Sequence, residues 1–216
     1  METLASAVWL TVGLTVVGGY LLGSIPFGLI ATRLGGAGDI RQIGSGNIGA
    51  TNVLRSGRKD LAAITLIGDA GKGAVAVLLA HLLTDGNAFV VALAGGSAFV
   101  GHLFPVWLKF NGGEGVATFY GVLLAAAWPV GVLAALTWIA MAFLFRMSSL
   151  AALTAAALAP LFCLAIDNTP RPMMVLSLVM AVLIFIRHHE NIRRLLKGEE
   201  PKIGAGKAEP PPTPDA

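Results

Sequence analysis

The segment 44–55, Gly-Ser-Gly-Asn-Ile-Gly-Ala-Thr-Asn-Val-Leu-Arg, combines closely spaced glycines with hydroxyl, amide and guanidinium groups. Glycines let the backbone curl so that successive N–H groups converge, an arrangement that binds anions such as phosphate. Arg55 adds a planar, charged fork that suits phosphate. We therefore expect an anion-binding loop, with a flexible polar connection as the alternative. The candidate residues are Gly44, Ser45, Gly46, Asn47, Gly49, Thr51, Asn52 and Arg55.

Two common phosphate-binding loops are excluded. The segment lacks the Gly-x-x-x-x-Gly-Lys-Ser/Thr spacing of a Walker A loop. No strand is expected before it, as a dinucleotide-binding fingerprint requires. A formal net charge of +3 is weak support for a nucleic-acid partner, because basic residues in an apolar chain first indicate membrane topology.

A second glycine cluster lies at 111–118, Asn-Gly-Gly-Glu-Gly-Val-Ala-Thr, where we expect a helix to begin. The N–H groups of a helix N-terminus carry partial positive charge and attract anions. The cluster therefore predicts a phosphate loop, although a plain turn explains it equally well. Its candidate residues are Gly112, Gly113, Glu114 and Gly115, and His102 shortly precedes them.

Charged residues also occur inside an apolar segment, at Asp69 and Lys72. Residues three apart share one face of a helix, so these two side chains can pair. Charges within a membrane are costly and are usually either functional or paired. Both explanations, a structural ion pair and a functional site, fit the sequence.

The segment 187–194, Arg-His-His-Glu-Asn-Ile-Arg-Arg, follows the last apolar stretch. Adjacent residues on a helix point about 100° apart, so the two histidines do not share a ligand face. A His-Glu-x-x-His pattern is also absent, and we expect no metal. His188 and Asn191 fit a reactive site, and a basic membrane exit is the alternative.

The chain has 216 residues, of which 56% are hydrophobic and 12% are charged. The charged share is about half the roughly 25% of a soluble domain. A helix needs about 20 apolar residues to cross the hydrocarbon core of a bilayer. The crossing segments are expected to be helices because the backbone must satisfy its own hydrogen bonds there. We predict an all-α polytopic membrane domain over residues 1–202 and a disordered, proline-rich cytoplasmic tail at 203–216. The apolar segments are 8–30, 61–83, 88–108, 116–145, 150–166 and 173–186.

The segment 116–145 is either one tilted crossing or two short ones that are separated near Trp128-Pro129. Two crossings give seven transmembrane helices, with the N-terminus outside and the C-terminus cytoplasmic. This topology puts 13 of the 15 Lys and Arg residues inside, as the positive-inside rule favours. Six helices would place Arg146 and the basic tail outside, so we predict seven.

Taken in order, these segments resemble the bacterial acyl-phosphate-dependent glycerol-3-phosphate acyltransferases, the PlsY family. The resemblance spans about residues 8–202. It rests on the segments 23–28 (Gly-Ser-Ile-Pro-Phe-Gly), 44–55, 69–73, 101–105, 112–118 and 188–195. No single segment is decisive, whereas the ordered set is highly specific.

The resemblance implies that a fatty acyl phosphate donates its acyl group to the 1-hydroxyl of sn-glycerol 3-phosphate. The products are lysophosphatidate and phosphate, in the first acylation of bacterial phospholipid synthesis. The implied partners are acyl phosphate, glycerol 3-phosphate and membrane lipid, without nucleic acid, cofactor or metal. The implied location is the bacterial inner membrane, with the active site facing the cytoplasm.

The resemblance also implies roles for individual residues. Those at the reacting groups would be Ser45, Arg55, His188 and Asn191, with His188 or a substrate phosphate as the base. Asp69, His102 and Glu200 would be structural. The residues that would bind substrate or phosphate are Gly44, Gly46, Asn47, Gly49, Thr51, Asn52, Lys72, Gly112, Gly113, Glu114 and Gly115.

The chain departs from the family at Glu114, where the family normally has lysine in a Gly-Gly-Lys-Gly sequence. A carboxylate in place of an ammonium changes the local charge by two units. Against a phosphate at close range this change costs on the order of a few kcal/mol. We therefore expect weaker acyl-phosphate binding or low activity, unless Lys72, Lys109 or bound water compensates.

The alternative function is a transporter or binding protein for phosphate-bearing solutes. It would account for Asp69 and Lys72 and for both glycine clusters. Transporters of this kind usually contain inverted repeats, and the sequence shows no internal repeat.

Overall fold

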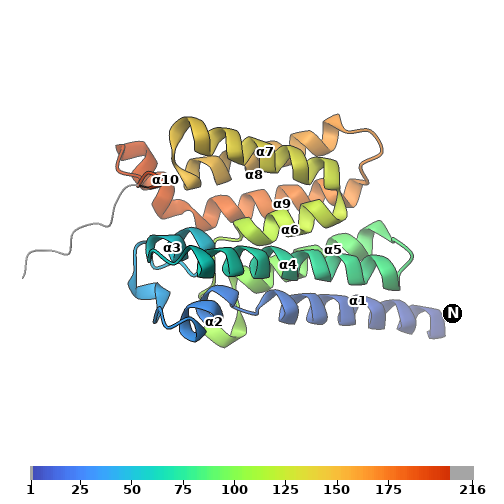
Figure 1. The fold of residues 1–216 in the computed structure, drawn as a ribbon. Coiled ribbons are helices and arrows are strands. Elements are labelled where there is room, and N and C mark those ends of the chain that lie inside the picture. The colour runs from blue at the N-terminus through green and yellow to red at the C-terminus, as the bar shows by residue number, and fades with distance from the viewer. Residues whose placement is uncertain (1, 205–216) are drawn as a thin grey trace, which may run out of the picture.

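The computed structural model describes residues 2–204, and all of its regular elements are helices (Figure 1). The predicted tail at 203–216 therefore lies almost wholly outside the described residues. The α-helices are α1 (Glu2–Gly23), α2 (Phe27–Leu34), α3 (Ala50–Arg55), α4 (Lys59–Leu83), α5 (Ala88–Leu103), α6 (Val116–Ala126), α7 (Trp128–Phe145), α8 (Ser148–Ala165), α9 (Arg171–Arg187) and α10 (His189–Lys197). Two 3-10 turns, η1 (Ile40–Gln42) and η2 (Val106–Leu108), lie in the connections. The all-helical prediction is confirmed for this part of the chain.

Five segments of the described chain are long and apolar enough to cross a membrane: 6–34, 59–83, 88–108, 128–145 and 148–165. The pair α9 and α10, bent by 64°, gives a sixth if it counts as one crossing. The chain does break where 116–145 was expected to divide, because α6 ends at Ala126 and α7 begins at Trp128. Proline in the first turn of α7 suits this start, since it has no N–H to donate. Because α6 has only 11 residues, seven crossings remain a prediction.

The first apolar segment differs from the predicted single helix over 8–30. α1 ends at Gly23 and α2 begins at Phe27, with Pro26 between them. Proline has no N–H to continue the helix and disfavours helical geometry at the residue before it. Gly23 also packs so closely on α5 that a side chain there would overlap the Ala98 carbonyl. The break between α1 and α2 therefore has a local cause. It leaves main-chain groups near Pro26 free to form hydrogen bonds with other residues.

The long helices form a bundle in which α7 and α8 lie on one side and α1, α4 and α5 on the other, with α6 and α9 between them (Figure 1). Large apolar side chains such as Phe99, Phe119 and Met180 fill the interior. Small residues allow close helix contact, as where Gly121 of α6 meets the backbone of α4. Other large apolar side chains, among them Phe143, face outward, as lipid surroundings favour.

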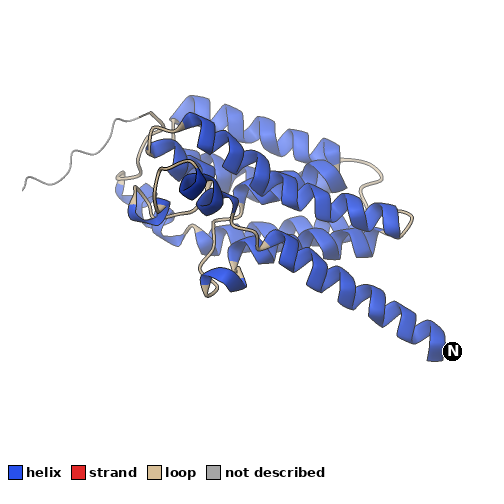
Figure 2. Ribbon diagram, turned by 60° about the horizontal axis from the view of Figure 1, so that its bottom comes forward, coloured by secondary structure: helices blue, strands red, loops and turns tan. Residues whose placement is uncertain are grey.

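The connections that carry the candidate site gather at one end of the bundle. Figure 1 shows α2, α3 and α10 at this end and the N-terminus of α1 at the opposite end, and the loops around the short helices lie at the same end in Figure 2. A small apolar cluster packs the segment 35–58 against α4, and it consists of Leu29, Ile40, Ile48, Val53, Leu61 and Ala62. The first glycine loop therefore has a packed base that fixes its position.

Candidate active site

Asn52 organises the first glycine loop from within. Its side chain is buried, and its amide donates to the carbonyls of Ile40, Ile43 and Asn47 at 2.8–3.0 Å. Its Oδ1 accepts from the Ser45 N–H at 3.0 Å. The Asn52 amide is thus occupied within the loop, so this residue shapes the loop.

The second glycine loop is clamped between the ends of α5 and α9. The N–H groups of Gly112 and Gly113 donate to the carbonyls of Leu103 and His102, at 3.0 and 3.1 Å. Arg187 donates from its guanidinium to the carbonyls of Gly112 at 2.9 Å and Gly113 at 3.2 Å. A side chain at Gly112 would overlap the His102 carbonyl, and one at Gly113 would overlap the imidazole. Both glycines therefore allow the loop to pack closely against His102, and their own N–H groups already donate to carbonyls of α5.

The N–H groups best suited to an anion in this region belong to the start of α6. A helix leaves the N–H groups of its first turn without partners inside the helix. Gly115, Val116 and Ala117 lie there and line the cavity described below. Gly115 is at φ +90°, and a side chain on it would meet Phe99. The helix dipole adds partial positive charge at this point.

Asp69 and Lys72 form a buried ion pair. Their Oδ1 and Nζ atoms are 2.7 Å apart, and Lys72 also donates to the Ile25 carbonyl at 2.7 Å, where α1 and α2 separate. His102 Nδ1 lies 3.5 Å from the same Asp69 oxygen. Lys72 is outside the cavity wall, so the geometry favours a structural pair over phosphate binding by Lys72.

The corner between α9 and α10 presents His188 and Asn191. His188 is 1% exposed, and its Nδ1 lies 2.8 Å from a main-chain carbonyl one turn earlier. Asn191 donates to Glu200 Oε1 at 2.9 Å, and Arg194 donates to Glu200 Oε2 at 2.7 Å. Burial alone would raise the pKa of Glu200, but the hydrogen bonds from Asn191 and Arg194 and the positive charge of Arg194 keep this pKa below its ordinary value. An ionised Glu200 therefore fixes the orientation of Asn191.

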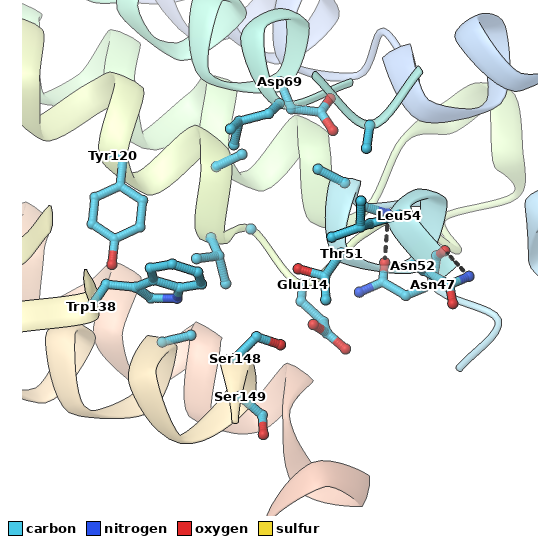
Figure 3. A pocket seen from close by; sticks show the side chains of 18 of the residues that line it. Asn47, Thr51, Asn52, Leu54, Asp69, Glu114, Tyr120, Trp138, Ser148 and Ser149 are labelled. Atoms are coloured by element: carbon cyan, nitrogen blue, oxygen red, sulfur yellow. Dashed lines mark hydrogen bonds between the residues drawn. The ribbon is translucent and has the colours of Figure 1, made fainter. Parts of the chain in front are cut away.

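The two loops and this corner line one cavity of about 430 Å³ (Figure 3). Its polar end is formed by the first glycine loop with α3, the start of α6 and the α9–α10 corner. Its apolar end lies among α4, α6 and α7, with Leu66, Tyr120, Trp138 and Ile139 in the wall. Leu66 and Ile139 are half-exposed, so the apolar end reaches the side of the bundle.

The cavity brings together most of the residues predicted from the sequence. The wall contains Ser45, Asn47, Gly49, Thr51, Asn52, Arg55, Asp69, His102, Glu114, Gly115, His188 and Asn191. The residues that lie outside the wall are Gly44, Gly46, Lys72, Gly112, Gly113 and Glu200. Within residues 2–204, no group of three or more His, Cys, Asp or Glu side chains is placed to hold a metal ion.

Sequence reasoning missed several residues of this site. Arg187 lies in a basic run, which gives no sign that its guanidinium clamps a distant loop. Ser148 and Ser149 begin α8 and line the polar end, and Trp138 of α7 lines the apolar end. None of these three belongs to a pattern that distinguishes it from other helix residues.

Comparison with known proteins identifies the family. The profile of the glycerol-3-phosphate acyltransferase family matches residues 13–198. The chain belongs to this family. A glycerol-3-phosphate acyltransferase of Caulobacter vibrioides (strain NA1000 / CB15N) is 78% identical over 218 residues, covering 100% of each chain. Another, of Rhodospirillum rubrum, is 58% identical over 208 residues, covering 94% of this chain and 95% of that relative.

The fold of this acyltransferase matches a solved member of the family. The crystal structure of PlsY, an integral membrane glycerol 3-phosphate acyltransferase, in its glycerol 3-phosphate form has a TM-score of 0.84 and 37% identity, over 89% of this chain and 96% of that one. The lysophosphatidic acid form has a TM-score of 0.81 and 35% identity, over 89% and 95% of the two chains. The resemblance to PlsY enzymes seen in the sequence is therefore confirmed.

Proposed function

We propose that this acyltransferase moves a fatty acyl group from acyl phosphate to the 1-hydroxyl of sn-glycerol 3-phosphate and releases lysophosphatidate and phosphate. The observation that carries the proposal is the two-part cavity, whose polar end continues into an apolar end between helices. Donor and acceptor each have a phosphate, and the donor also has an acyl chain. The reaction therefore needs both parts of this cavity.

The polar end supplies groups that bind anions. Arg55 offers a charged fork, Ser45 and Thr51 offer hydroxyl groups, and the start of α6 offers main-chain N–H groups. These groups come from separate segments of the chain that line the same polar end, so together they can hold two phosphates close to the reacting atoms. The solved PlsY structures, in glycerol 3-phosphate and lysophosphatidic acid forms, support these two molecules as acceptor and product.

Acyl phosphate is a mixed anhydride and needs little further activation. The acceptor hydroxyl oxygen forms a bond to the acyl carbon, the bond from that carbon to the phosphate oxygen breaks, and phosphate leaves with the electron pair. The hydroxyl proton goes to His188 Nε2 or to a substrate phosphate. Ser45 and Arg55 act at the reacting oxygens, and Asn191 orients the acceptor. Catalysis then consists mainly of positioning and charge stabilisation.

The apolar end holds the acyl chain in this proposal. Tyr120 and Trp138 supply aromatic surface, and Leu66 and Ile139 continue the wall to the outside of the bundle. Burying a chain against such surfaces is favourable because it removes apolar area from water.

The orientation in the membrane is part of the same proposal. We place the polar end at the cytoplasmic face of the bacterial inner membrane, with seven crossings and the N-terminus outside. The short helices at this end of the bundle carry Arg33, Arg55 and Arg194, as expected of the positive-inside rule (Figure 1). A membrane domain at 1–202 and a cytoplasmic tail at 203–216 complete the arrangement.

The test is phosphate release from palmitoyl phosphate by the detergent-purified protein, with and without glycerol 3-phosphate. We expect release to require the acceptor and to equal the lysophosphatidate formed. Equal release without the acceptor would show hydrolysis and overturn the proposal. The transporter alternative predicts instead that reconstituted vesicles take up glycerol 3-phosphate without forming lysophosphatidate.

A further inference from the structure

The carbonyl groups at the end of α5 have no partners inside the helix, so they bond to other segments. Those of His102 and Leu103 accept from the second glycine loop, at 3.1 and 3.0 Å. The next carbonyl along the chain, that of Phe104, accepts from the hydroxyl group of Tyr20 on α1, at 2.7 Å. One helix end is therefore tied both to the candidate site and to a residue 84 positions earlier in the sequence.

Tyr20 itself lies outside the wall of the cavity, but Phe104 connects it to a residue that shapes the polar end. The Arg187 guanidinium lies over the Phe104 ring, with its central carbon 5.7 Å from the ring centroid. A cation in this position is attracted by the electron-rich face of the ring. The same guanidinium donates to the carbonyls of Gly112 and Gly113. Phe104 thus supports Arg187, while Tyr20 fixes the main chain of Phe104.

The second glycine loop leads directly into the first turn of α6, whose residues line the polar end. We propose that Tyr20 is a positioning residue that acts through Phe104 and Arg187 to place the N–H groups of this turn against the phosphate of the acyl donor. The identity of that phosphate rests on the proposed function. The series of contacts from α1 to the loop rests on the geometry alone.

Tyr20→Phe removes the hydroxyl group and keeps the ring. The Phe104 carbonyl then loses this donor, which is costly for a group away from water, so Phe104 should turn toward other donors. Its ring would then support Arg187 less well. A displacement of about 1 Å in an active site can cost about 100-fold in rate, and we expect a smaller loss, roughly tenfold, because Arg187 keeps its bonds to the glycine carbonyls.

The experiment compares Tyr20→Phe with the unchanged chain in two measurements on detergent-purified protein, acyl-transfer kinetics and amide hydrogen exchange of residues 112–117. We expect the KM for palmitoyl phosphate to rise roughly tenfold. The KM for glycerol 3-phosphate should change by a smaller factor, because Asn191 is held separately by Glu200. A general loss of folded protein would lower kcat and leave both KM values unchanged. Exchange at 112–117 should become faster, because the loop loses part of its support.

Trp107→Phe is the matched control. The Trp107 indole donates to Ser24 Oγ at 2.7 Å, so this bond also joins the chain after α5 to the end of α1. Neither of these two residues lines the cavity. The control should therefore keep the KM values and the hydrogen exchange of the unchanged chain.

A double variant separates an effect through Arg187 from a general one. If Tyr20 acts through Arg187, Tyr20→Phe should add little to the loss that Arg187→Lys causes alone. Full multiplication of the two losses overturns the proposal, as does an unchanged KM for palmitoyl phosphate or unchanged exchange at 112–117 in Tyr20→Phe. Faster exchange in a protein whose unchanged chain transfers no acyl group would overturn only the proposed function.

Discussion

The Arg187 guanidinium donates to the Gly112 carbonyl at 2.9 Å, although the two residues are 75 positions apart in the sequence. This bond joins the end of α9, which precedes His188, to the loop that opens α6. Arg187 also lies over the Phe104 ring, with its central carbon 5.7 Å from the ring centroid. One side chain thus holds two walls of the polar end at a fixed separation.

Arg187→Lys should impair catalysis more than stability. Lysine keeps the positive charge but cannot donate in two parallel directions from a rigid plane. Because a displacement of about 1 Å can cost about 100-fold in rate, we expect kcat/KM for acyl transfer to fall by roughly that factor. Steady-state kinetics would measure it, with the exposed Arg193→Lys as control. Full activity in Arg187→Lys would show that the clamp does not position the site.

Breaking the buried pair of Asp69 and Lys72 should destabilise the fold. Lys72→Met leaves Asp69 as a buried charge without its main partner, which typically costs about 3–5 kcal/mol. The double variant Asp69→Asn with Lys72→Met removes both charges and should recover much of the loss. Unfolding temperatures in detergent measure both effects. If the single and double variants unfold at the same temperature, the pair is not coupled as described.

Glu200 should make stability depend on pH in the acidic range. Its folded-state pKa lies below the ordinary value of 4.5, so the ionised carboxylate stabilises the fold fully above that value. This stabilisation is lost as the pH falls through the lowered pKa. Glu200→Gln should therefore unfold at a lower temperature near neutral pH, and the difference should shrink below about pH 4. Thermal unfolding across this range tests the claim, with Glu199→Gln as control, and a constant difference would contradict it.

Ala135 of α7 should influence which acyl chains the enzyme accepts. It lines the cavity together with Trp138, so Ala135→Phe places a ring in the apolar end. We expect about a tenfold loss of kcat/KM for palmitoyl phosphate and a smaller loss for a short-chain acyl phosphate. Leu136→Phe is the control, because Leu136 faces outward on the same helix. Equal losses for both chain lengths would place the acyl chain elsewhere.

Glu114→Lys should increase acyl transfer. The substitution replaces a carboxylate in the cavity wall with an ammonium, and a phosphate nearby should bind more tightly. We expect the KM for acyl phosphate to fall by roughly tenfold or more. Glu199→Lys adds the same charge change outside the cavity and serves as control. If Glu114→Lys does not increase acyl transfer or lower the KM for acyl phosphate, the Glu114 carboxylate does not weaken phosphate binding.

The sequence predicts the helices well because apolar length and proline act locally. The separation of α6 from α7 follows from Pro129, and the same rule applied to Pro26 would have divided the first apolar segment. Donor-rich residues such as Ser45 and Arg55 are also visible in the sequence and do line the cavity. Their types and spacing carry this information without any knowledge of the fold.

The remaining features depend on contacts between distant segments. The N–H groups of Gly112 and Gly113 donate to carbonyls at the end of α5. The spacing of the glycines in the sequence does not reveal these hydrogen bonds. The partner of Glu114 is His188, at the corner between α9 and α10, which the chain reaches only after three further long helices. Such contacts depend on how the helices pack against one another. The sequence therefore indicates which groups are present but not which groups they contact.

The half-exposed Leu66 and Ile139 have a consequence for how the enzyme meets its donor. A cavity that opens sideways lets a hydrophobic tail enter from the bilayer without passing through water. If the proposed function holds, the enzyme meets its donor within the plane of the bilayer, and we expect turnover to follow the mole fraction of donor among the surrounding lipids. Diluting that film with inert lipid should slow the enzyme even when the total amount of donor in the sample stays the same.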